Sequence, residues 1–325
     1  MHHSRSTRRT LLLGATAAGA LLATGARAQA AFPSRTIRIL VPFPAGGAGD
    51  VAVRLVAKPL SAALGQPVVV ENKPGGDGVI AVQELLRSAP DGHTLMFGTP
   101  SALLYVPLTN SKPPYDSLKD LDPVSHFSSF TYFIYVSDEL PIRSLEELIA
   151  FARANPGKLA YGTGDSTQIV AMAQICQQAN LDMVHVPYKG TSQVVTDFVG
   201  GRLQLMVSSV EAIEQTRGKA RPLAVLLPRR STLKPEVPTF AEAGLRSVTL
   251  RPWTAFFAPG GTPRPVLDKL SATMATVFRQ PDLVEFFGVR GSVLESSSPD
   301  ALRALLVEQM PIWRDAIRFA KIPIQ

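Results

Sequence analysis

The chain has 325 residues, 46% of them hydrophobic, and its 33 Lys and Arg against 26 Asp and Glu give a formal net charge of +7. Residues 1–30 hold four arginines and no acidic residue, so the rest of the chain has 29 basic against 26 acidic side chains, about +3 net. Nucleic-acid binding needs Lys and Arg clustered on one face, so this balance argues against a nucleic-acid partner. The single cysteine, Cys176, excludes an internal disulfide bond.

The first 30 residues have the pattern of an export signal. Arg5, Arg8 and Arg9 precede an apolar run at 11–22, and a small-x-small cleavage site ends at Ala30. The run is too short to cross a bilayer, which takes about 20 residues. We therefore predict a periplasmic protein that is cleaved near Ala30, and the paired arginines leave both the Sec and the twin-arginine routes open.

Short apolar runs alternate with helical patterns along the chain, which predicts an α/β fold with mostly parallel sheets. After removal of the signal, about 295 residues remain, more than the usual single domain of about 100–200 residues, so two domains are expected. Strands are predicted at 36–43, 68–71, 94–97, 131–136, 159–161, 183–186, 203–207, 223–227 and 253–258. Beyond the last of these, the pattern is purely helical.

The helical block at the C-terminus has no sheet of its own, so it must pack on a sheet formed earlier in the chain. The chain is thus expected to leave lobe one, build lobe two and return. Lobe one comprises residues 31–130 and 254–325, and lobe two comprises residues 131–253, with crossovers near Phe130 and Trp253. This arrangement places a ligand cleft between the lobes.

A glycine-rich loop at 42–50 follows the first predicted strand and precedes a helix. Glycines allow a ligand to approach the backbone closely, and unpaired amides at a helix start favour an anion. The alternative is an ordinary strand-to-helix turn in which Asp50 interacts only with the helix dipole. The loop lacks the Lys-Ser/Thr ending of a phosphate-binding loop, so a nucleotide is not expected.

A second loop of this kind, at 161–167, lies between a strand and a helix of lobe two. Its alternative interpretation is simple N-capping by Ser166 or Thr167. Neither loop contains Lys or Arg, so unpaired backbone amides at 46–48 and in the loop at 162–167 are predicted to hold a carboxylate without an arginine clamp.

Catalytic motifs are weak, and no catalytic residue, metal or cofactor is predicted. The turn at 76–81 fits a G-x-G-x-x-A pattern, but the strand at 94–97 ends without the acidic residue that would bind a ribose. Ser231 and Lys234 match S-x-x-K without a partner K-T-G motif. His185 and Cys176 lie at positions that suggest core packing. An α/β oxidoreductase using the 76–81 turn remains the alternative from the enzyme class.

Several short motifs, in this order, resemble the Bug, or TctC-like, substrate-binding proteins of tripartite tricarboxylate transporters. The resemblance runs from about Pro33 to the C-terminus. The motifs are R-I-L-V-P-F-P at 38–44, G-Q-P-V-V-V-E-N-K-P-G at 65–75, A-P-D-G at 89–92, V-H-V-P-Y-K-G at 184–190, V-P-T at 237–239 with A-G at 243–244, and A-P-G-G-T-P at 258–263.

The resemblance implies a two-lobed Venus-flytrap protein of the periplasm with two crossovers. Such a protein binds a small carboxylate between its lobes through backbone amides and ordered water, and delivers it to membrane transporter subunits. It needs no cofactor and acts as a monomer. The predicted ligand-binding residues are Phe43, Pro44, Ala45, Gly46, Gly47, Ala48, Asp50, Thr99, Ser101, Gly162, Thr163, Gly164, Asp165, Ser166, Thr167, Tyr188, Lys189 and Ser208.

Two departures from the family pattern bear on the ligand. Q-I-V-A at 168–171 stands where the family often has Ser/Thr-His-Leu-Ala, and Ser208 stands where an aspartate is common. The loss of that acid removes a partner for a ligand amine, which favours ligands other than amino acids. A membrane sensor, instead of a transporter, is the alternative partner for the same fold.

Overall fold

The computed structural model describes residues 32–210, 212–246, 250 and 252–325. The predicted export signal and its cleavage site at Ala30 lie outside the described residues. Within those ranges, no helix combines the length and the apolar character that crossing a membrane requires.

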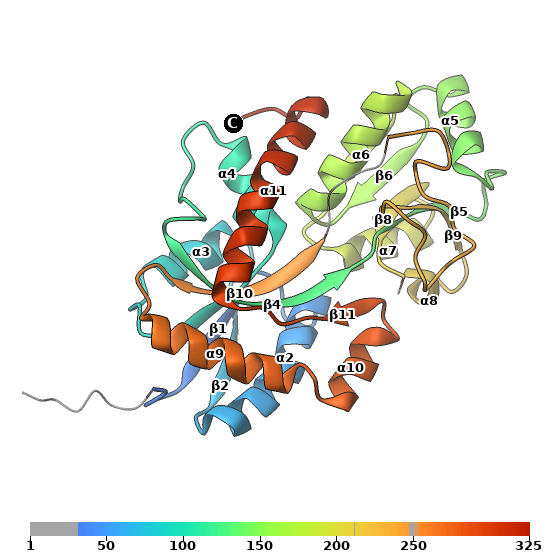
Figure 1. The fold of residues 1–325 in the computed structure, drawn as a ribbon. Helices are drawn as coiled ribbons and strands as arrows, with labels where there is room; N and C mark the ends of the chain where they lie inside the picture. The colour runs from blue at the N-terminus through green and yellow to red at the C-terminus, as the bar shows by residue number, and fades with distance from the viewer. Residues whose placement is uncertain (1–31, 211, 247–249, 251) are drawn as a thin grey trace, which may run out of the picture.

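The strands of the described residues form two sheets, one in each half of the molecule (Figure 1). In spatial order, the six-stranded sheet contains β11 (Ser292–Leu294), β4 (Leu121–Phe130), β10 (Trp253–Pro259), β3 (Thr94–Gly98), β1 (Ile37–Val41) and β2 (Val68–Asn72). The five-stranded sheet contains β7 (Val184–Pro187), β6 (Ala160–Thr163), β8 (Leu205–Ser208), β5 (Phe133–Ser137) and β9 (Ala220–Val225). This is the α/β architecture with two sheets that the sequence predicts.

Helices cover both sheets. With the six-stranded sheet lie α2 (Ala48–Leu64), η2 (Gly76–Gly78), α3 (Val79–Leu86), the π-helical turn η3 (Ser101–Tyr105), α4 (Val106–Thr109), α9 (Arg264–Val277), α10 (Pro281–Gly288) and α11 (Pro299–Phe319). With the five-stranded sheet lie α5 (Leu145–Ala154), α6 (Ser166–Ala179), α7 (Thr191–Val199) and α8 (Ala212–Gln215).

The chain passes between the sheets after β4 and again before β10. Trp253 pairs with Ser129 of β4 and therefore begins the returning strand, although the predicted boundary placed it in lobe two. The other predicted boundaries remain a proposal about where the lobes divide.

The prediction of mostly parallel sheets is wrong. β1 pairs in parallel with β2 and β3, and β6 with β7 and β8. The pairs of β10 with β3 and β4, of β11 with β4, and of β5 with β8 and β9 are antiparallel. The reason is that β10 returns from the other sheet and inserts between β3 and β4 against their direction.

Strand β4 is absent from the sequence prediction, and so is β11, which interrupts the block expected to be purely helical. Strand β4 contains Pro123, His126 and three serines, so it lacks an apolar run. Pro123 is tolerated because β11 pairs only with 128–130, which leaves the strand edge at Pro123 without a partner strand there. Burial of polar residues thus hides this strand from a hydrophobic pattern.

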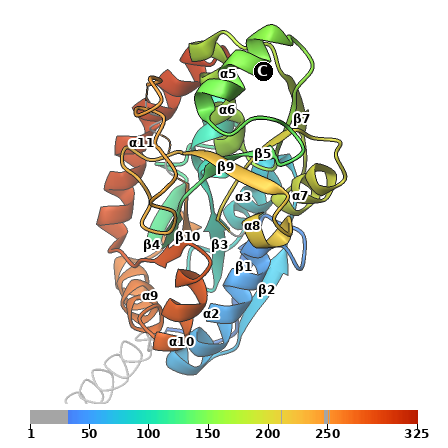
Figure 2. The ribbon, with the colours of Figure 1, turned by 90° about the vertical axis from the view of Figure 1, so that its right-hand side faces the viewer.

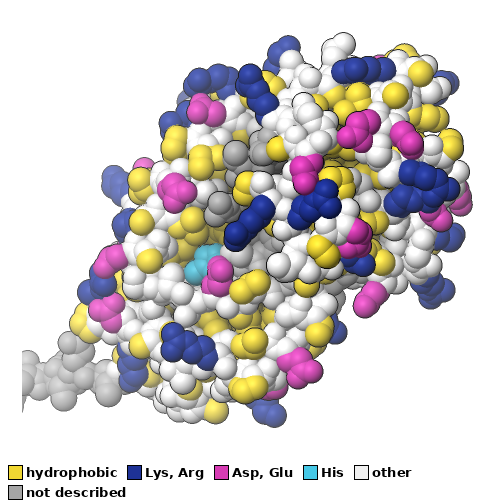
Figure 3. Space-filling view, turned by 45° about the vertical axis from the view of Figure 1, so that its right-hand side comes forward, with side chains coloured by type: hydrophobic (Ala, Val, Ile, Leu, Met, Phe, Trp, Pro, Cys, Tyr) yellow, Lys and Arg dark blue, Asp and Glu magenta, His cyan; other side chains and the backbone are white. Residues whose placement is uncertain are grey.

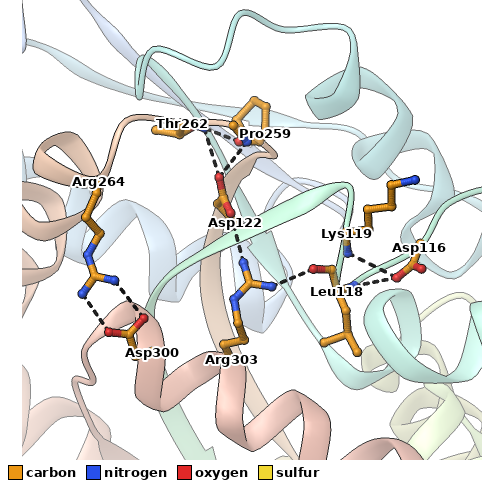
Figure 4. A network of polar contacts seen from close by, with 10 residues as sticks. Asp116, Leu118, Lys119, Asp122, Pro259, Thr262, Arg264, Asp300 and Arg303 are labelled. Carbon is orange, nitrogen blue, oxygen red and sulfur yellow. Dashed lines mark hydrogen bonds and ion pairs between the residues drawn. The ribbon is translucent and has the colours of Figure 1, made fainter.

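Helix α11 joins the two halves of lobe one and reaches towards lobe two. It contacts β4 and also α6, and Figure 2 shows it along one side of the molecule, up to the level of α6. Its Arg303 donates to Leu118 O and to Asp122 Oδ1, while the other oxygen of Asp122 accepts from the amides of Gly261 and Thr262 (Figure 4). This network fastens the helix to the start of β4 and to the turn after β10.

Candidate functional site

Three segments from both lobes meet beside η3. A Cβ at Gly78 would lie 2.8 Å from Ala102 Cβ and 3.5 Å from Pro42 Cβ, so the start of the 42–50 loop, η2 and η3 are in close contact. The amide of Ser166, at the start of α6, donates to Ser101 Oγ at 3.2 Å. Both serines are buried. The structure therefore brings the two predicted loops to one place, where the lobes touch.

Asp50 organises the 42–50 loop. Its side chain is buried and accepts hydrogen bonds from the Gly46 amide at 2.9 Å, from Asn72 Nδ2 at 2.8 Å and from Arg54 Nε at 2.9 Å. The Gly47 amide donates to Pro44 O. The prediction that the Gly46 and Gly47 amides are unpaired is therefore wrong, because acceptors within the loop already use both.

The first turn of α2 retains donors for an anion. Gly47 is the N-cap and provides no side-chain cap, and the first helical bond runs from the Val51 amide to Gly47 O. Among the described residues, no acceptor bonds to the amides of Ala48, Gly49 and Asp50. Amides at such a position, together with the helix dipole, favour a negative charge.

Gly49 is fixed by the packing of Phe43. A Cβ at Gly49 would lie 2.6 Å from Phe43 Cδ2, so only glycine allows this ring to lie against the first turn of the helix. Phe43 packs edge-on against Phe97 of β3, with 6.5 Å between ring centroids. The loop is thus held by an aromatic contact as well as by Asp50.

The 161–167 loop is built around a different cap. Asp165 is the N-cap of α6 and accepts from the Gln168 amide at 3.0 Å and from Tyr132 Oη at 2.5 Å. Gln168 Oε1 in turn accepts from the Gly164 amide at 2.6 Å. The capping alternative thus describes this helix start, but the capping residue is Asp165. The prediction of unpaired amides in this loop is wrong, because the amides of Gly164, Ser166 and Gln168 all have hydrogen-bond partners.

Lobe two instead offers side-chain donors. Ser166 and Gln168 are fully buried, and Ser166 Oγ and Gln168 Nε2 have no hydrogen-bond partner among the described residues. A buried donor without an acceptor costs about 1–3 kcal/mol, so an oxygen atom of a ligand or of water is favoured beside each. The predicted site residue Ser166 therefore acts through its hydroxyl group.

The other predicted residues divide into three groups. Thr99, which precedes η3, and Ser208, at the end of β8, are buried, while Pro44, Ala45, Gly46 and Ala48 are exposed on the loop of lobe one. Thr163 Oγ1 bonds His185 Nε2, Tyr188 Oη donates to Asp197, and the Lys189 amide donates to Gln193. Gly162 packs against Leu203 and Val194. The last four residues stabilise lobe two internally.

Sequence reasoning missed Arg54, Asn72, Tyr132 and Gln168. The sequence did contain an indication of the roles of Asp50 and Gln168. Both occupy the third position of their helix, where an acidic or amide side chain can accept a hydrogen bond from a backbone amide before the helix. In the described parts of the chain, no group of three His, Cys, Asp or Glu side chains is placed to hold a metal ion.

Burial raises the pKa of Asp165 above its ordinary value of 3.8, although the hydrogen bonds from Tyr132 and Gln168 oppose the shift. A raised pKa means that the folded state holds the proton more tightly than the unfolded chain. The stability linked to this group is therefore fully present below pH 3.8 and is lost as the pH rises through the raised pKa.

Asp165→Asn is expected to remove this pH dependence, because asparagine caps a helix as well as aspartate does and does not titrate. The free energy of unfolding, measured in urea from about pH 4 to about pH 8, should improve in the variant relative to wild type as the pH rises. A difference between the two proteins that stays constant over this range would contradict the assignment.

Comparison with known proteins gives a consistent result. The chain matches the TctC family, described as the tripartite tricarboxylate transporter family receptor, over residues 52–318. It is 35% identical to BugT of Bordetella pertussis over 294 residues, which cover 88% of this chain and 90% of the relative.

Solved structures match over nearly the whole chain. A periplasmic transporter protein has a TM-score of 0.83 at 32% identity, covering 91% of this chain and all of that chain. An R. palustris protein solved with adipate has a TM-score of 0.83 at 29% identity, covering 90% and 99%. MatC from Rhodopseudomonas palustris, solved with bound malate, has a TM-score of 0.81 at 28% identity, covering 88% and 100%.

Proposed function

The chain belongs to the family of tripartite tricarboxylate transporter receptors, and from this membership we propose that it captures a small carboxylate between its lobes and delivers it to membrane transporter subunits. Solute-binding receptors of this family are transport components and not enzymes. The relatives solved with adipate and with malate make dicarboxylates the first candidates.

The single observation that carries the proposal is the contact of the α6 start with η3, where the Ser166 amide donates to Ser101 Oγ. The start of the 42–50 loop lies close by, since a Cβ at Gly78 would meet both Ala102 of η3 and Pro42. One carboxylate of the ligand accepts from the amides of Ala48, Gly49 and Asp50. Ser166 Oγ supplies a donor from lobe two. Figure 3 shows Lys and Arg mixed with Asp and Glu on the face in view. The proposal therefore does not include attraction of the carboxylate ligand by a broad positive surface on that face.

Export and assembly complete the proposal. The protein is a periplasmic monomer whose signal is removed near Ala30. Intact mass spectrometry of periplasmic material should find a chain lacking the first 28–30 residues, because cleavage follows the small-x-small site. Recovery of only full-length chain from the cytoplasm would count against export.

Ala48→Pro tests the amide cradle. Proline is tolerated at the first helical position, and Gly47, at φ −72° and ψ 161°, already has the extended backbone that a residue before proline needs. Folding should therefore survive while one amide donor is lost. A hydrogen bond to a charged group contributes about 1.5–3 kcal/mol, so affinity should fall about ten- to a hundred-fold.

The measurement is calorimetry with the carboxylate that stabilises wild type most in a thermal screen of di- and tricarboxylates, beginning with adipate and malate. Ala48→Ser is the matched control, because it keeps the amide and should bind as wild type does. Unchanged affinity in a well-folded Ala48→Pro protein would remove this helix start from the site.

A further inference from the structure

A cavity of about 450 Å³ lies between β4, β10 and α11, and we call it the α11 pocket. Its walls share no residue with the candidate carboxylate site. The lining residues that matter for its chemistry are His126, Trp253, Glu295, Leu302, Leu305 and Gln309.

Two buried polar atoms in the wall of the α11 pocket have no partner among the described residues. They are Trp253 Nε1 and Gln309 Oε1, on residues only 2% and 3% exposed. A third buried atom, His126 Nδ1, lies 3.3 Å from Glu295 Oε2. Each unpartnered buried group costs free energy that a suitable occupant would recover. The indole nitrogen only donates and the amide oxygen only accepts, so the occupant must supply both an acceptor and a donor.

The wall that carries the charge of the pocket is firmly built. Glu295 donates its amide to Phe127 O at 2.9 Å, and its carboxylate accepts from Ser129 Oγ at 2.8 Å. Ser297, two residues further on, is bonded in both directions to β4, through the amide of His126 and through Ser125 Oγ. The carboxylate of Glu295 is therefore held at the rim of the pocket.

The charge and the apolar surface of the α11 pocket select the class of ligand. Among the described residues that line it, Glu295 is the one acidic group, and no Lys or Arg is present. Burial lowers the pKa of His126, with Glu295 opposing the shift, so this ring is neutral at neutral pH. Leu302 and Leu305 add an apolar wall. The pocket thus disfavours the carboxylates proposed for the cleft and favours a cation.

We propose that the α11 pocket binds a small organic cation of the amino alcohol class with an apolar body. The ammonium group donates to the Glu295 carboxylate and to Gln309 Oε1. The hydroxyl oxygen accepts from Trp253 Nε1–H, and the apolar body lies against Leu302 and Leu305. Both unpartnered groups named above then have a partner.

The test uses the indole N–H signals of the mature, ¹⁵N-labelled protein, titrated with 2-amino-1-phenylethanol. The chain has two tryptophans, and Trp313→Phe assigns their signals. The Trp253 signal should shift saturably, because its N–H gains an acceptor, while the Trp313 signal should stay in place. The uncharged analogue 1-phenylethanol should bind at least about tenfold more weakly, since it lacks the charge that Glu295 recognises.

Variants separate binding from folding. Glu295→Gln should weaken binding about tenfold, whereas Glu308→Gln, an exposed acid of α11 outside the pocket, should leave it unchanged. Gln309→Leu should also weaken binding, and it should fold, because it removes a buried polar atom that has no partner. Absence of a saturable Trp253 shift would show that water alone fills the pocket and would overturn the proposal. Equal binding of 1-phenylethanol, or no loss in Glu295→Gln, would overturn the cation class.

Discussion

Gly164→Ala is expected to lower the free energy of unfolding by about 3 kcal/mol and to weaken carboxylate binding strongly. The added Cβ would lie 2.6 Å from the carbonyl carbon of Gly190 and 2.8 Å from Thr191 Cα, and nearer still to Thr191 N. All three are backbone atoms, so no side chain can rotate away. The 188–191 loop must move off the 163–165 loop, and Asp165 and Ser166 move with it.

Gly190→Ala is the matched control for that prediction. Gly190 belongs to the same contact, but a Cβ placed on it meets no heavy atom within 4 Å, and its φ of 172° is ordinary extended backbone. Urea unfolding followed by circular dichroism should therefore separate the two variants clearly. Equal midpoints for Gly164→Ala and Gly190→Ala would show that the close approach of the two loops is unimportant.

The strands and helices that the sequence predicts correctly are those whose burial matches an apolar pattern. Strands β1, β2 and β3 follow from apolar runs, and the loop at 42–50 follows from the glycines between a strand and a helix. Strand β4 was not predicted because it buries the polar residues Ser125, His126 and Ser128, whose hydrogen-bond partners come from distant segments. The sequence also did not predict the antiparallel pairing of β10, because this pairing depends on the return of the chain from the other lobe.

The sequence is enough to propose two loops as the site, but it cannot tell which backbone amides in those loops already have hydrogen-bond partners. Three adjacent residues, Asp165, Ser166 and Thr167, can each cap a helix, and only tertiary contacts decide which one does. Asp165 is the residue that caps the helix, because Tyr132, from the crossover after β4, donates a hydrogen bond to its side chain. Likewise, Asp50 is held by Asn72 from β2, a contact between residues 22 positions apart. The structure identifies which donors in the two loops have no partner among the described residues.

Asp50→Ala is expected to lower the free energy of unfolding by about 2–3 kcal/mol and to abolish measurable carboxylate binding, the largest effect on the site. The variant removes a carboxylate that accepts hydrogen bonds from three donors. The Gly46 amide and Asn72 Nδ2 therefore lose an acceptor, and Arg54 loses its ion pair. The loop then no longer places the first turn of α2. Arg54→Ala should cost much less, because that side chain is half exposed and solvent replaces its contact.

The pH dependence distinguishes this account from a simple packing defect. Although burial opposes ionisation, the hydrogen bonds from Arg54, Gly46 and Asn72 hold the pKa of Asp50 below its ordinary 3.8. A lowered pKa contributes stability that is present above pH 3.8 and is lost as the pH falls through the folded-state value. The difference in unfolding free energy between wild type and Asp50→Ala should therefore shrink in acid, opposite in sign to the trend expected for Asp165→Asn. Urea unfolding at a series of pH values measures both trends, and a deficit in Asp50→Ala that does not change with pH would mean that the charge of Asp50 is not what anchors the loop.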